Sequence, residues 1–147
     1  MKIHELLNES SVVGSINWSR KNLTTLKGCP AKCLDYLICD NNNLESLNLG
    51  PSYIGGFFSC KNNKLESLSQ IHKHIKFIGG VLDVRFNPLT KNLLGLILID
   101  GLIEIRLDNK NIAGILNKYL LQSNKKRAML QCQQELIEAG FDEAAQL

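Results

Sequence analysis

The sequence predicts an α/β solenoid of about five repeats, with a parallel β-sheet along the stack and a helical cap at each end. Three observations carry this prediction. Short apolar motifs recur at a nearly fixed spacing, an asparagine recurs at one position of the motif, and the periodicity becomes helical after the last copy. The 147 residues suffice for one structural domain, which we divide into an N-terminal cap (1–12), repeats (13–115) and a C-terminal cap (116–147).

The first segment is expected to be a short amphipathic helix over residues 1–9. Ile3, Leu6 and Leu7 would share one side of this helix. A helix here would cover the open edge of the first repeat, which a solenoid must protect.

The repeats occupy the middle of the chain. Three copies align without a gap, and two looser copies follow; they cover residues 16–23, 37–44, 58–65, 82–89 and 105–112. Their closing residues are spaced by 21, 21, 24 and 23 positions. A period in the low twenties is typical of stacked coils rather than of an ordinary globular fold.

Each copy reads h-x-h-x-x-N-x-h, where h is apolar. The first two apolar positions alternate as in a short strand with one buried face; they are Ile16 and Trp18, Leu37 and Cys39, Phe58 and Cys60, Leu82 and Val84, and Ile105 and Leu107. The asparagines are Asn42, Asn63 and Asn87, whose side chains can bridge backbone groups from one repeat to the next. Glycine pairs at 55–56 and 79–80 suggest chain reversals that need positive φ.

These residues make the chain resemble leucine-rich repeat proteins, whose motif L-x-x-L-x-L-x-x-N-x-L matches here from about Val13 to Ile115. The short period is most similar to bacterial-type repeats, including those of secreted effectors and of small repeat proteins encoded by bacteria and phages. Cysteine replaces leucine at Cys39 and Cys60, and the last two copies are longer. The resemblance implies that the strands line a concave face used for binding.

After Ile112 the apolar spacing becomes helical. One stripe contains Ile115, Leu116, Tyr119 and Leu120, and a second contains Met129, Leu130, Gln133, Leu136 and Ile137. The second helix is expected to end at Ala139-Gly140. Two helices would therefore cap the C-terminal end of the stack.

On the concave face that the resemblance implies, the residues between the buried strand positions point outward. They group apolar side chains in the middle of the stack and charged side chains at its end. We expect a partner to be bound by Tyr36, Ile38, Phe57, Lys61, Val81, Asp83, Arg85 and Arg106. Grouped exposed aromatic residues have the character of an interface hot spot, and the charges would form a polar rim. The alternative is that Tyr36 and Phe57 only pack against each other.

Composition and motifs argue against several other classes. A net charge of +3, with acidic and basic residues mixed on the proposed face, gives little support to nucleic-acid binding. The longest apolar run, residues 93–105, is interrupted and too short to span a membrane. No secretion signal or even cysteine framework is evident, so we expect a cytoplasmic protein with reduced thiols. No metal, cofactor or catalytic constellation is expected, although Cys29 and Cys33 resemble half of a metal clip.

The sequence therefore predicts a non-enzymatic module that binds another protein through the concave face. A role as a phage or bacterial inhibitor of a host or defence protein is implied by the resemblance alone. The alternative is binding or dimerisation through the C-terminal helices, with the repeats as a scaffold. A homodimer that closes the apolar patch on itself is a further alternative.

Overall fold

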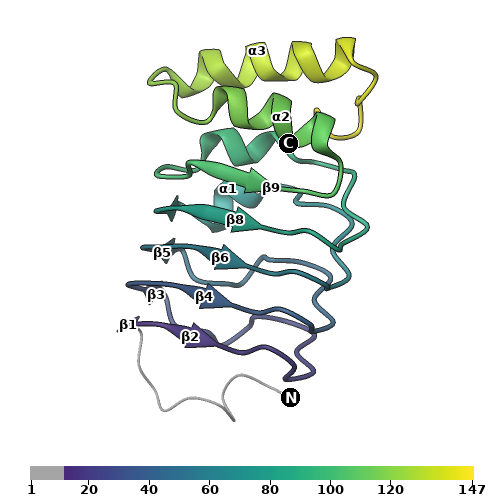
Figure 1. Ribbon diagram of the computed structural model, residues 1–147. Helices are drawn as coiled ribbons and strands as arrows, with labels where there is room; N and C mark the ends of the chain where they lie inside the picture. The colour runs from purple at the N-terminus through teal and green to yellow at the C-terminus, as the bar shows by residue number, and fades with distance from the viewer. Residues whose placement is uncertain (1–11) are drawn as a thin grey trace.

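The computed structural model describes residues 12–147, so the helix expected over residues 1–9 lies outside the described part. Val12, which we had assigned to the same cap, already begins a strand. From there the chain winds as a parallel β-solenoid of about five turns, with helices at its C-terminal end (Figure 1). The predicted fold class is confirmed.

Within residues 12–147 the turns contribute strands to two sheets, not one. The expected sheet has the order β2 (Ile16–Asn17), β4 (Leu37–Ile38), β6 (Phe58–Ser59), β8 (Val81–Asp83) and β9 (Glu104–Arg106). The second has the order β1 (Val12–Val13), β3 (Lys32–Cys33), β5 (Tyr53–Ile54) and β7 (Phe77–Ile78). All pairs are parallel, and the first sheet keeps the predicted register Ile16–Leu37–Phe58–Leu82–Ile105.

The recurring asparagines form the expected ladder. The Asn63 side chain accepts a hydrogen bond from the Leu44 N–H (3.0 Å) and donates to the carbonyls of Cys39 (3.0 Å) and Cys60 (3.2 Å). Asn42 and Asn87 make the equivalent bonds one turn earlier and one turn later. Each side chain thus satisfies buried or half-buried backbone groups of two adjacent turns.

The glycine pairs play a different part from the predicted one. Among the described residues, positive φ occurs at glycines 28, 101 and 140, and not at either pair. Instead, successive turns approach closely here: a Cβ built on Gly55 would lie 2.1 Å from the Leu34 carbonyl oxygen, and one on Gly79 would lie 2.0 Å from the Gly55 carbonyl oxygen. Glycine is required at these corners because a side chain has no room.

The interior of the stack is a continuous apolar core. Cys39 and Cys60 are fully buried at the positions predicted for them, in line with Trp18 and Val84. The extra residues of the longer turns form the short helix α1 (Ile71–His74), which buries Ile71, and the 3₁₀ helix η2 (Leu94–Leu98), which buries all its residues but the last. No helix within residues 12–147 is long and apolar enough to cross a membrane.

Two helices cover the last turn, as predicted: α2 (Lys110–Tyr119) and α3 (Lys125–Glu138), the latter ending before Gly140 (Figure 1). Helix α2 begins earlier than expected because the Asn109 side chain caps it, accepting bonds from the N–H groups of Asn111 and Ile112. The Asn117 side chain bonds both the N–H (2.7 Å) and the C=O (2.9 Å) of Ile105, so α2 satisfies backbone groups of the last strand.

The buried stripe of α3 agrees with the predicted one only in part: Leu136 is buried, and Met129 and Gln133 are half-buried. Its buried residues are Ala128, Cys132 and Leu136, whereas Leu130 and Ile137 are exposed. Helix α3 packs on η2 and α2, and small side chains allow that close approach. We had sought the stripe among large apolar residues and therefore placed it about one residue out of phase.

The last residues return to the repeats. The carbonyls of Glu143, Ala144 and Gln146 accept bonds from the N–H groups of residues 92, 93 and 94 at 2.9–3.1 Å. The carbonyl of Leu147 accepts one from the N–H of Gln70 at 2.6 Å. This tail fixes the cap to two successive turns.

Candidate functional site

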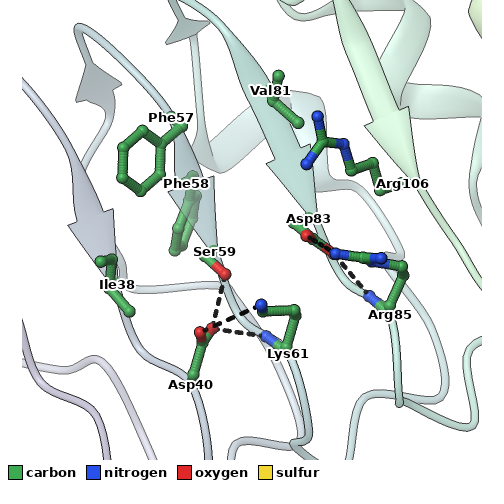
Figure 2. Close-up of a pocket in the computed structure, with 10 residues that line it drawn as sticks. All are labelled: Ile38, Asp40, Phe57, Phe58, Ser59, Lys61, Val81, Asp83, Arg85 and Arg106. Carbon is green, nitrogen blue, oxygen red and sulfur yellow. Dashed lines mark hydrogen bonds and ion pairs between the residues drawn. The ribbon is translucent and has the colours of Figure 1, made fainter.

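The candidate site lies on the outer face of the five-stranded sheet, which we call the sheet face. Its hollow, of about 390 Å³, is lined by Ile38, Asp40, Phe57, Phe58, Ser59, Lys61, Val81, Asp83, Arg85 and Arg106. Figure 2 shows these residues arranged across neighbouring strands, with the Phe58 ring behind the sheet in the core. Seven of the eight residues predicted to bind a partner therefore line one hollow, and Tyr36 is the exception.

Tyr36 lies beside the hollow and stacks on Phe57. The two ring centroids are 4.9 Å apart and the ring planes differ by 4°. The packing that we had considered as the alternative is therefore real, yet Phe57 remains 42% exposed. Ile38 and Val81 on the adjoining strands are half-buried. Together these side chains give the hollow an apolar part.

The carboxylates that line the hollow are held within the sheet. Asp40 Oδ1 accepts bonds from Ser59 Oγ (2.6 Å) and from the Lys61 backbone N–H (2.9 Å). Both Asp83 oxygens accept bonds from the Arg85 guanidinium, at 3.0 and 2.8 Å. Burial acts to raise the pKa of Asp83, but the hydrogen bonds and positive charge of Arg85 outweigh it, and the pKa lies below its usual value.

The cations of the hollow are more exposed than its anions. The side chains of Lys61, Arg85 and Arg106 are 36%, 39% and 47% exposed, against 17% for Asp40 and 10% for Asp83. Arg106 pairs with Glu104 at 3.3 Å, and Lys61 Nζ lies 4.0 Å from Asp40 Oδ2. The pairs Asp83–Arg85 and Glu104–Arg106 could have been predicted from the sequence, because residues two positions apart in a strand lie on the same face.

A second hollow of about 420 Å³ adjoins the first and shares Asp40 and Lys61 with it; Asn41, Asn62 and Phe86 complete its lining. Phe86 is 64% exposed and has a φ of 60°, a conformation that costs a bulky residue energy. Asn62 and Asn41 occupy the same left-handed position one and two turns earlier, respectively. Our sequence reasoning did not select Phe86, although an aromatic residue interrupts a polar column there.

Burial affects the thiols of Cys29, Cys33 and Cys132. Burial raises the pKa of Cys29 to about 12, of Cys33 to about 11 and of Cys132 to about 12, so these thiols are protonated at neutral pH. Within residues 12–147 no group of three or more His, Cys, Asp or Glu side chains could hold a metal ion.

The helical cap offers a second exposed surface. Leu130 and Ile137 lie seven residues apart on the outer side of α3, and both are exposed, as is Leu121 in the preceding loop. Exposed basic residues occur in the first turn of α3, at Lys126 and Arg127. No hollow that we describe includes these residues.

Comparisons of the chain with models of protein families, with curated proteins and with solved structures find no match. The fold and the sheet face therefore define the class of this protein: a β-solenoid with a helical C-terminal cap.

Proposed function

We propose that this chain is a non-enzymatic protein-binding module whose partner docks on the sheet face. The observation that carries the proposal is the hollow itself, in which the exposed Phe57 ring lies beside exposed cations on a hydrogen-bonded sheet. An apolar centre with a charged margin is the usual anatomy of a protein interface. Covering the exposed 42% of Phe57 would contribute about 2 kcal/mol, at about 200 Å² for the residue and about 25 cal/mol per Å².

The proposal also covers the repeat family and the biological role of the chain. We take the repeats to be leucine-rich repeats of the bacterial type, with the sheet face as the concave face. On the same resemblance we propose an inhibitor, of phage or bacterial origin, that blocks a host or defence protein. The five cysteines are all free, which suits a reducing, cytoplasmic setting.

The structure offers a matched pair of variants to test the proposal. The change Tyr36→Ala/Phe57→Ala removes the stacked rings of the sheet face. The change Tyr53→Ala/Phe77→Ala removes an equivalent stack on the other sheet, where the centroids are 4.8 Å apart. Both remove the same kind of packing, so they differ mainly in the face that they alter.

Each variant and the wild type would be used for affinity capture from a lysate of the source cells, with mass spectrometry of the retained proteins. We expect a protein that is captured by the wild type and by the Tyr53/Phe77 variant and is lost with the Tyr36/Phe57 variant. Equal capture by all three folded proteins would show that the sheet face is not the binding surface.

The exposed apolar residues on α3 favour a second candidate, binding or dimerisation through the cap. Leu130→Gln/Ile137→Gln leaves the buried face of α3 intact. Loss of the captured protein with this variant alone, or loss of a dimer in analytical ultracentrifugation, would assign the binding to the cap.

A further inference from the structure

The sheet face offers a partner hydrogen-bond donors rather than acceptors. Asp40 Oδ1 is bonded twice, both Asp83 oxygens are bonded to Arg85, and Asp40 Oδ2 has only the 4.0 Å contact with Lys61 Nζ. Their side chains are only 17% and 10% exposed. A basic partner would therefore find few carboxylate oxygens free to receive it.

The donors, by contrast, are available. Arg85 uses Nε and Nη2 on Asp83, which leaves Nη1 for another acceptor. Arg106 holds Glu104 only through long bonds of 3.3 and 3.4 Å. Figure 2 shows the Arg106 side chain extending from β9 towards Val81, so that both guanidinium groups border the same hollow. A carboxylate is the group whose planar oxygens best match such donors.

The apolar part of the hollow lies beside these donors. Phe57 and Val81 occupy equivalent positions on adjacent turns, each two residues before one of the paired strand residues Ser59 and Asp83. A side chain seated on Phe57 and Val81 would thus have the arginines within the same hollow. The site is suited to a segment that carries an apolar residue and an acidic residue close together.

We propose that the occupant of the sheet face is an acidic segment of the partner protein, in which an aspartate or glutamate lies within two residues of a large apolar side chain. The apolar side chain packs on Phe57 and Val81, and the carboxylate accepts hydrogen bonds from Arg106 and Arg85. This inference rests on the proposed function and adds the chemistry of the partner to it.

A polyphosphate fits the same donors less well. Asp40, Asp83, Glu104 and Asp108 lie among the three cations of this face and would repel a continuous row of phosphates. A single carboxylate on an apolar stem meets less of that repulsion, because it carries one negative charge and needs only the free donors of Arg85 and Arg106, which already neutralise their own acids Asp83 and Glu104.

The test is selection from a phage-displayed library of random twelve-residue peptides on the wild type and three variants. Arg106→Gln removes a cation whose partner, Glu104, is 46% exposed, so the fold is expected to tolerate it. Arg85→Gln removes the second cation, and Lys126→Gln/Arg127→Gln removes two exposed charges from the cap as a control. Circular dichroism and thermal melting confirm that each variant is folded.

We expect the wild type and the cap control to enrich peptides with an acidic residue within two positions of an apolar one. A selected peptide, labelled and followed by fluorescence anisotropy, should bind about tenfold more weakly to Arg106→Gln, the usual effect of losing a charged hydrogen bond. Phe57→Ala should weaken the same peptide as well.

Three results would overturn the inference. Enrichment of basic or uncharged peptides that still depend on Phe57 would refute the acidic partner while leaving the proposed function intact. Peptides whose binding ignores both Phe57 and the arginines, or no enrichment at all, would count against both. Displacement of the selected peptide by a twenty-nucleotide single-stranded DNA at equal concentration would show that the face binds any negatively charged chain and is not specific for an acidic peptide.

Discussion

The asparagine ladder allows a quantitative test of what holds the stack together. Asn63 is 7% exposed and joins two turns through its side chain. In Asn63→Ala the carbonyls of Cys39 and Cys60 keep the bonds that Asn42 and Asn87 donate to them. The Leu44 N–H, however, loses the side-chain oxygen that it contacts at 3.0 Å.

The expected loss follows from these contacts. A buried donor left without a partner costs about 1–3 kcal/mol, and the weakened bonding at the carbonyls adds about 1 kcal/mol. We therefore expect Asn63→Ala to lower the free energy of unfolding by about 2–4 kcal/mol. A loss of this size is a large fraction of the stability of a domain of this length.

The neighbouring asparagine provides the control. Asn62 is exposed, and its side chain donates only to Asn41 Oδ1 (2.7 Å). Asn62→Ala should cost about 1 kcal/mol or less, mostly because alanine tolerates the left-handed conformation less well. Urea unfolding followed by circular dichroism measures both variants. A loss for Asn63→Ala no larger than that for Asn62→Ala would refute the role of the ladder.

Four other changes have defined outcomes. Gly79→Ala, whose Cβ would lie 2.0 Å from a carbonyl oxygen, should lower the thermal midpoint by several degrees, and an unchanged melt would show that the corner can open. Phe86→Asn should raise the free energy of unfolding by about 1 kcal/mol in urea titrations, because asparagine adopts a φ of 60° at a lower energetic cost than phenylalanine. Iodoacetamide at pH 8 should label Cys29 of the native protein only slowly, because burial raises the pKa of this thiol to about 12. At pH 8 only about one Cys29 thiol in 10⁴ is then the reactive thiolate, and rapid labelling would contradict that burial. In Arg85→Gln the pKa of Asp83, followed by carboxyl ¹³C NMR, should rise, because burial then acts without the opposing cation. Ionised Asp83 contributes stability at neutral pH that is lost on acidification. In the variant this loss should therefore occur at a higher pH than in the wild type.

Much of the repeat architecture could be predicted because its chemistry recurs in the sequence. Asn42, Asn63 and Asn87 fall at one motif position, and only a side chain that both donates and accepts can bond the backbone of two turns there. The burial of Cys39 and Cys60 followed from the same alignment. The register of the main sheet needed nothing more than the spacing of these residues.

The second sheet was not predicted, and the glycine pairs were assigned a positive φ that they do not have. The strands of that sheet are two residues long, and β3, β5 and β7 carry one buried side chain each (Cys33, Ile54 and Ile78), which is too short a pattern to show alternation. Glycine serves both positive φ and close approach, and only the position of the next turn decides between them. At Gly55 and Gly79 that neighbour is a carbonyl oxygen.

The candidate site was predictable as a set of positions but not as a set of contacts. Phe57, Val81 and Arg106 line one hollow because they occupy the exposed columns of adjacent strands. The internal pairing of Asp83 by Arg85, and the exposure of Phe86 in the left-handed conformation, depend on side-chain and backbone geometry that the motif does not specify.

The return of the tail to the repeats has a consequence for how the molecule comes apart. In a one-dimensional stack each turn is coupled only to its neighbours, so a terminal unit can fray independently of the rest. Here the carbonyls of Glu143 and Leu147 are bonded to N–H groups at Asn92 and Gln70, which belong to different turns. Separating the cap from the stack must break both sets of bonds, so the cap and the last turns open as one cooperative unit. The C-terminal turns are therefore not expected to fray one at a time.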